Sequence, residues 1–96
     1  MYLEVLVCYD IANNKRRNKL VKELKDMGLQ NIQESVFWGR ILNPELKAIK
    51  KVFEELLKKD EDKAFILRCE LSKQIKYQSF GYPDDGSFEE REYEVC

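Results

Sequence analysis

The residues best suited to chemistry in this sequence lie where a predicted strand meets a predicted helix. Asp10 ends an apolar run that begins at Tyr2, and a group of cations follows directly. These cations are Lys15, Arg16, Arg17, Lys19 and Lys22. A carboxylate at the tip of a core strand, followed by cations at a helix start, is typical of a site for a metal ion and a phosphate. Because a buried charge without a partner is costly, we expect Asp10 to have one.

The cations lie where the helix macrodipole is already positive, which makes each of them unfavourable by roughly 0.3–1 kcal/mol. A phosphate bound at the helix N-terminus would reverse the sign of this effect, and an arginine can hold it with two hydrogen bonds. The alternative is a solvated basic face without a ligand. The neighbouring Asp10 favours the binding interpretation.

Asp10 also has a structural interpretation, as a turn or capping residue bonded to backbone N–H groups near Asn13. In addition, one carboxylate supplies few ligands for Mg²⁺, which prefers octahedral oxygen ligands and keeps several waters. A two-fold axis near the strand tip would bring two copies of Asp10 together. A cation between them would then offset their repulsion.

The composition excludes several classes of function. There is no histidine, so the usual general base and the Ser-His and Cys-His nucleophiles are absent. The three cysteines contain no C-x-x-C pair, which argues against structural zinc and favours a reducing compartment. No apolar run approaches the roughly 20 residues of a membrane span, and no leader precedes the first strand. We therefore expect a cytoplasmic protein without membrane contact, in which a metal or a carboxylate would activate water.

The hydrophobic periodicity predicts one α/β domain. The expected elements are a strand over 2–10, a helix from about 14 to 27, one bent or two short strands within 30–42, a helix from 43 to about 59, a strand over 64–71 and an edge strand over 75–80. Gly28 is suited to end the first helix, Asn43 to cap the second before Pro44, and Gly39 to form a bulge. The order favours a ferredoxin-like βαββαβ sandwich with an additional C-terminal strand, in a symmetric homodimer that covers the open sheet face.

Charge divides the chain into a body and a tail. Residues 1–82 carry 16 basic and 12 acidic side chains, whereas residues 83–96 carry one arginine and six acids. The body, the expected ferredoxin-like domain, could meet a polyanion that the tail would repel. The tail is expected to be an acidic segment or strand that contacts the dimer partner or another protein.

Phe37 and Trp38 are adjacent in a predicted strand, so their side chains face opposite sides of the sheet. One would enter the core while the other meets a partner. Packing in the core or in a dimer is favoured over stacking on a nucleic-acid base.

Taken together, several of these motifs resemble one known family. They are Tyr9-Asp10-Ile11 after an apolar strand, Arg17 seven residues beyond the aspartate, Gly28-Leu29, Ile32-Gln33, Ser35-Val36-Phe37, Asn43-Pro44 and Phe65-Ile66-Leu67. Over residues 2 to about 72 the chain is similar to the second CRISPR-associated protein family, the small subunit of the spacer-acquisition machinery. Their combined spacing is fairly specific, whereas each motif alone is weak.

The resemblance implies a ferredoxin-like homodimer in which each C-terminal strand pairs with the partner's sheet. It implies a Mg²⁺-dependent endonuclease, with Mn²⁺ as an alternative ion, on single-stranded RNA or double-stranded DNA. It also implies a bridge between two dimers of the CRISPR integrase subunit. The family's metal-binding aspartate falls on Asp10, its tyrosine on Tyr9, its helix arginine on Arg17 and its phenylalanine on Phe37. Tyr9, Asp10 and Arg17 are thus the expected catalytic residues, and Phe37 joins the expected nucleic-acid contacts.

Some positions depart from the family pattern. Asn13 and Asn14 replace acids found in some relatives, and Lys19 is a poorer bidentate phosphate ligand than arginine. Asn31 and Glu34 stand where basic or aromatic residues sometimes occur. These differences argue against efficient catalysis while leaving Asp10 in place.

Three functions stay open. In an enzyme, Asp10 from both protomers would position Mg²⁺ for phosphodiester hydrolysis, while Arg17, with Arg16 and Lys19, holds a phosphate. In a non-catalytic scaffold of the adaptation complex, the basic helix would follow a DNA backbone without reading its sequence. A ferredoxin-like regulatory domain for a small ligand would show no affinity for nucleic acid.

Overall fold

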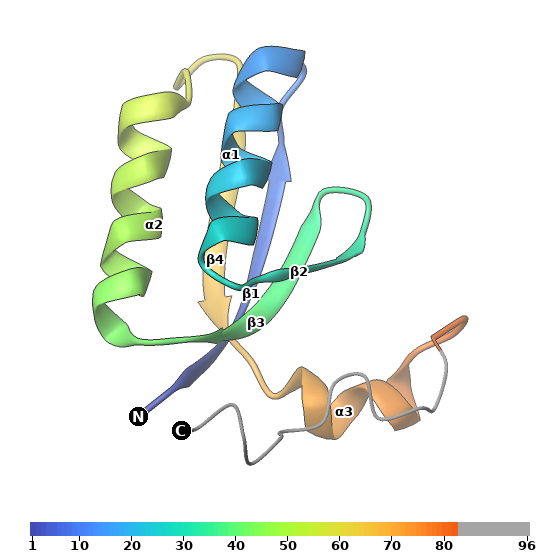
Figure 1. Cartoon of the computed structure of the whole chain (residues 1–96). Coiled ribbons are helices and arrows are strands. Elements are labelled where there is room, and N and C mark those ends of the chain that lie inside the picture. The colour runs from blue at the N-terminus through green and yellow to red at the C-terminus, as the bar shows by residue number, and fades with distance from the viewer. Residues whose placement is uncertain (83–96) are drawn as a thin grey trace.

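The computed structural model describes residues 1–82, in which two helices cover one face of a four-stranded sheet (Figure 1). The elements are β1 (Leu3–Asp10), α1 (Asn14–Asp26), β2 (Gln30–Gln33), β3 (Val36–Ile41), α2 (Asn43–Leu56), β4 (Lys63–Arg68) and α3 (Leu71–Gln78). The strand order is β2-β3-β1-β4, and all neighbouring strands are antiparallel. This is the predicted ferredoxin-like arrangement, with β1 at the centre.

The core lies between α1, α2 and the sheet face that they cover. Its buried side chains are Val5, Val7, Ile11, Leu20, Leu24, Leu29, Phe37, Ile41 and Ile49. Alternate residues of β1 and β3 point into it, and residues four apart on α1 meet them. Each large side chain buried here stabilises the fold by about 1.5–3 kcal/mol. The core thus fixes α1 against β1, which places the junction between these two elements.

The helix ends follow local capping rules. Asn13 caps α1, because its side chain accepts a hydrogen bond of 2.9 Å from the backbone N–H of Arg16. Gly28 has a φ of 87° just after α1, the left-handed conformation expected of a glycine that ends a helix. In α2, Leu42 rather than the predicted Asn43 is the N-cap, and its N–H donates to the Glu45 carboxylate over 2.8 Å. That helix ends at Leu56, earlier than predicted.

Of the two alternatives for residues 30–42, the structure has the two short strands. They join in a turn at Glu34 and Ser35, where Ser35 has a φ of 63°. The bulge predicted at Gly39 is instead on β2, between Asn31 and Gln33. Gly39 pairs regularly with Val5, and a Cβ at this position would lie 2.6 Å from Leu29 Cδ2. The glycine is needed for this close approach.

The edge strand predicted over 75–80 is wrong, because the chain forms α3 there. Glu4 on β1 explains the helix: its carboxylate accepts hydrogen bonds from the Ser72 N–H at 3.0 Å and the Ser72 hydroxyl at 2.8 Å. An acid at this position satisfies a free N–H of the first turn and complements the helix dipole. Alternation over so short a segment does not distinguish a strand from a helix. The tail over 83–96 lies outside the described residues.

The other face of the sheet is apolar and partly uncovered. Leu6 and Cys8 of β1 alternate with the core residues and pair with Leu67 and Phe65 of β4. The side chains of Phe65 and Leu67 are 52% and 45% exposed. Figure 1 shows α3 beyond the end of the sheet that is opposite to the start of α1. No helix within residues 1–82 is long and apolar enough to cross a membrane.

Candidate functional site

A cleft of about 510 Å³ opens between the end of β1, the first turns of α1 and the β2–β3 turn. It is lined by Tyr9, Asp10, Ile11, Ala12, Arg17, Asn18, Val21, Asn31, Glu34 and Ser35. The three residues predicted to be catalytic, Tyr9, Asp10 and Arg17, therefore share one cleft. The crossover from β1 to α1 brings the first two next to the third.

Asp10 is the last residue of β1 and is exposed to solvent. It therefore does not need the partner that a buried charge would require. Its backbone pairs with that of Lys63 on β4, but its side chain forms no hydrogen bond or ion pair within residues 1–82. The alternative role predicted for Asp10, as a capping residue, is filled by Asn13, which is the N-cap of α1. The Asp10 carboxylate is therefore available to a ligand of the cleft.

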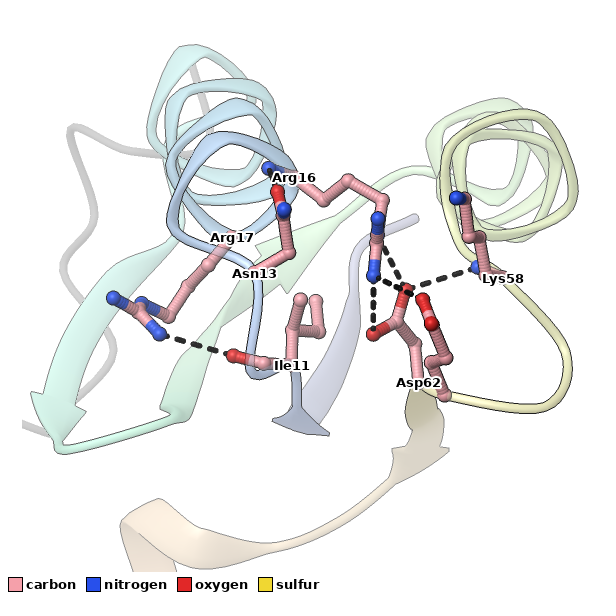
Figure 2. Close-up of polar contacts among 7 residues, drawn as sticks. Ile11, Asn13, Arg16, Arg17, Lys58 and Asp62 are labelled. Atoms are coloured by element: carbon pink, nitrogen blue, oxygen red, sulfur yellow. Dashed lines mark hydrogen bonds and ion pairs between the residues drawn. The ribbon is translucent and has the colours of Figure 1, made fainter.

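The guanidinium of Arg17 is held at the wall of this cleft. One terminal nitrogen donates to the carbonyl oxygen of Ile11 over 3.0 Å (Figure 2). The other terminal nitrogen donates to the side-chain oxygen of Asn14. An arginine has five N–H donors, so these contacts orient the group and leave donors for a phosphate. Asn14 was noted in the sequence only as a departure from the family pattern, but here it positions Arg17.

Arg16 has a different role from its neighbour. Figure 2 shows the two arginines leaving the first turn of α1 in opposite directions. Arg16 Nε donates to Asp62 Oδ2 over 2.7 Å, and its Nη2 donates to Asp62 Oδ1 at 3.2 Å and to Glu61 Oε2 at 3.0 Å. The Asp62 side chain is fully buried and also accepts the Lys58 N–H. Arg16, predicted to bind nucleic acid, instead fastens α1 to the loop before β4.

The hydrogen bond from Arg16 holds the pKa of Asp62 below its ordinary value, helped by the Lys58 N–H and opposed by burial. The aspartate is therefore ionised at neutral pH, and a phosphate would have to displace it from Arg16. Sequence reasoning did not identify this ion pair, because its partners are 46 positions apart. The acidic segment Asp60-Glu61-Asp62 was interpreted only as a polar loop.

The predicted lysines lie outside the cleft. Lys15 is exposed in the first turn of α1. Lys19 and Lys22 line a separate groove of about 480 Å³ between α1 and α2, which also includes Val52 and Leu56. The cations that looked like one cluster in the sequence therefore point in three directions around the helix. Arg17 is the cation that lines the Asp10 cleft.

Phe37 lies in the core and has an exposed fraction of 1%. Its ring centre is 6.2 Å from that of Tyr9, so it supports the tyrosine from the interior. This burial leaves no surface on which a base could stack. The core-packing interpretation therefore describes Phe37. Trp38 on the other face is also buried, with its Nε1 donating to Glu4 over 2.9 Å and the Arg40 guanidinium 5.0 Å from its ring centre.

The Tyr9 side chain lines the cleft, and its backbone holds the neighbouring β2–β3 turn in place. Burial raises the pKa of its hydroxyl, with Arg17 lowering it and Glu34 raising it. The hydroxyl therefore stays protonated at neutral pH and can donate a hydrogen bond. The Tyr9 backbone N–H donates to the Ser35 carbonyl over 3.1 Å, which ties the β2–β3 turn to the end of β1. The turn residues are part of the site, although the sequence pattern alone did not locate the turn.

The donor set of the cleft fits Mg²⁺ in one particular mode. Within residues 1–82, no three acidic or cysteine side chains form a group that could hold a metal ion. The carboxylates that line the cleft are Asp10 and Glu34. Mg²⁺ is commonly held by one or two carboxylates together with waters and substrate phosphates. These residues fit that mode of binding and do not form an all-protein cage.

Comparisons with known proteins agree with this fold. A family model described as "CRISPR associated protein Cas2" matches residues 1–76. The CRISPR-associated endoribonuclease Cas2 1 of Francisella tularensis subsp. novicida is 44% identical over 87 residues, which cover 91% of this chain and 88% of that protein. The CRISPR-associated endoribonuclease Cas2 of Desulforudis audaxviator is 31% identical over 90 residues, covering 88% and 84%.

Solved structures give the same result. The crystal structure of Streptococcus pyogenes Cas2 aligns with a TM-score of 0.67 at 26% identity, covering 82% of this chain and all of that one. A second Cas2 crystal structure aligns with a TM-score of 0.62 at 31% identity, covering 71% and 75%. Tyr9, Asp10 and Arg17 line one cleft, and the family model matches residues 1–76; the chain belongs to the Cas2 family of CRISPR-associated proteins.

Proposed function

We propose that this chain is a metal-dependent endonuclease that cleaves phosphodiester bonds, with RNA as its first substrate, in the cleft of Tyr9, Asp10 and Arg17. The observation that carries the proposal is the meeting of an exposed carboxylate and an oriented guanidinium in one cleft. Two relatives whose matches cover most of this chain are named endoribonucleases. Double-stranded DNA is the alternative substrate.

Each side chain has a defined part in this proposal. Asp10 would hold Mg²⁺, or Mn²⁺ in its place, which lowers the pKa of a bound water and offsets negative charge in the transition state. Arg17 would bind the phosphate next to the scissile bond through its remaining N–H donors. Tyr9, which is protonated at neutral pH, would donate a hydrogen bond to a substrate oxygen. No histidine is required.

A symmetric homodimer is the proposed functional unit. Its support is the partly uncovered apolar sheet face, on which Phe65 and Leu67 are exposed. Exposed apolar patches of this kind often mark protein interfaces. Light scattering after gel filtration is expected to give twice the chain mass for the wild type. Phe65→Asp is expected to give the monomer, and a dimer that survives this change would place the interface elsewhere.

A second candidate is a non-catalytic DNA-binding scaffold that bridges CRISPR integrase subunits in the cytoplasm. It is favoured by the exposed cations outside the cleft: Lys15, and the two lysines of the α1–α2 groove. Such cations can follow a phosphate backbone without contributing to chemistry. The two candidates differ in what Asp10 does, because only the enzyme requires its carboxylate.

The deciding experiment measures cleavage of single-stranded RNA and double-stranded DNA with Mg²⁺, Mn²⁺ or EDTA. Wild type, Asp10→Asn and Asp60→Asn are purified side by side; the last makes the same chemical change at an exposed loop position. Metal-dependent cleavage that is lost in Asp10→Asn and kept in Asp60→Asn supports the enzyme. Cleavage that is absent, or equal in all three proteins, leaves the scaffold.

A further inference from the structure

The β2–β3 turn places a second carboxylate, that of Glu34, at the cleft that contains Asp10 and Arg17. The turn is held from two sides. The Tyr9 N–H donates to the Ser35 carbonyl over 3.1 Å. The Asn31 side chain donates to the carbonyls of Gln33 and Val36, both over 2.9 Å. These contacts fix the backbone on both sides of Glu34, so its charge stays near the cleft even though the residue is exposed.

The cleft therefore contains more negative than positive charge. Its ionisable lining comprises the carboxylates of Asp10 and Glu34, the guanidinium of Arg17 and the neutral hydroxyl of Tyr9. The Glu34 charge also acts on Tyr9 in the cleft wall: burial raises the pKa of Tyr9, Arg17 lowers it, and Glu34 raises it by a smaller amount. A phosphodiester that approaches Arg17 would meet repulsion from the same carboxylate. A divalent cation at Asp10 would offset that repulsion.

We propose that Glu34 is a specificity-determining residue that opposes binding of nucleic-acid phosphate in the cleft unless a divalent cation is present. The inference rests on the proposed function, because it takes the cleft as the phosphate site. Glu34 then makes binding conditional on the ion: Arg17 alone attracts the phosphate too weakly, and the cation removes the opposing charge. A metal-free protein would not hold nucleic acid unproductively in this cleft.

The test compares Glu34→Gln with Glu54→Gln, which removes the same charge from an exposed position on α2. Binding of a fluorescein-labelled single-stranded RNA is measured by anisotropy, in EDTA and in a Mg²⁺ titration, and each reading is taken within the time in which gels show the RNA to be still intact. In EDTA, Glu34→Gln is expected to bind the RNA roughly five- to tenfold more tightly than the wild type. The reason is that the substitution removes the repulsion between one carboxylate near the protein surface and the phosphate. Mg²⁺ is then expected to strengthen binding less in this variant than in the wild type.

Two further variants make the result decisive. Glu34→Asp keeps the charge and is expected to behave like the wild type, and Arg17→Gln is expected to weaken binding in every condition. If Glu34→Gln and Glu54→Gln bind equally in EDTA while Arg17→Gln binds weakly, the role of Glu34 is refuted and the phosphate site stands. If Arg17→Gln binds as the wild type does, the cleft is not the phosphate site, and the proposed function fails with the inference.

Discussion

Replacement of Phe37 separates a core role from a nucleic-acid role, since the family resemblance assigns the second and the structure shows the first. Phe37 is 1% exposed and packs beside the ring of Tyr9. Phe37→Ala is expected to cost about 3–5 kcal/mol through lost burial and a cavity, a large part of the stability of a small domain. Phe37→Leu keeps most of the volume and loses the aromatic pair, so we expect it to cost about 1–2 kcal/mol.

The measurement is urea unfolding followed by the fluorescence of Trp38, the only tryptophan in the chain. A cost of this size lowers the unfolding midpoint of Phe37→Leu by about 0.5–1 M urea. Phe80→Leu makes the same change at a residue that is 99% exposed and is expected to leave the midpoint unchanged. RNA binding by folded Phe37→Leu is expected to equal that of the wild type. An unchanged midpoint together with severalfold weaker binding would refute the core assignment.

Three further changes test other parts of the structure. Gly39→Ala places a Cβ 2.6 Å from Leu29 Cδ2, so thermal melting should show a loss of about 1–3 kcal/mol from overpacking; an unchanged melting temperature would contradict the close approach. Asp62→Asn weakens the tie to Arg16 and should lower the urea midpoint, and RNA binding should weaken slightly because the first turn of α1 is then less well ordered. Tighter binding at an unchanged midpoint would mean that the freed Arg16 reaches phosphate, and would return it to the nucleic-acid interface. Burial raises the pKa of Glu4, but hydrogen bonds from Trp38 and Ser72 outweigh it and hold the pKa below the ordinary value of a glutamate. The stability that these bonds provide is therefore present above the pKa of Glu4 in the unfolded chain and lost as the pH falls through its lower folded-state pKa, so Glu4→Gln should flatten the acid side of a stability–pH curve. Parallel curves for both proteins would contradict this.

Much of the fold was predictable because its determinants are local. The alternating core residues of β1, the apolar stripe of α1 and Gly28 after it are each set by nearby positions. Asp10 and Arg17 could be placed together for the same reason, since a short loop separates the strand from the helix. The β2–β3 turn was harder to locate, because Glu34 and Ser35 form no glycine- or proline-based turn signal and a serine has to adopt a positive φ.

The remaining features depend on residues that are distant in the sequence. The helix at 71–78 donates hydrogen bonds from its first turn to Glu4 of the first strand, and no pattern within the helix indicates this contact. The use of Arg16 is decided by Asp62, and the burial of Phe37 by its facing the helices rather than the open sheet face. Helix periodicity shows which cations share a face, but it does not show which of them already have partners.

The ion pair between Arg16 and Asp62 also has a consequence for how readily the cleft can bind. It anchors the first turn of α1 to a buried carboxylate, so the backbone that carries Arg17 is fixed before any ligand arrives. The entropic cost of ordering that turn therefore falls on folding rather than on association, which favours tighter binding for the same set of contacts. In this way, the ion pair of Arg16 with Asp62 holds in place the turn that carries its neighbour Arg17.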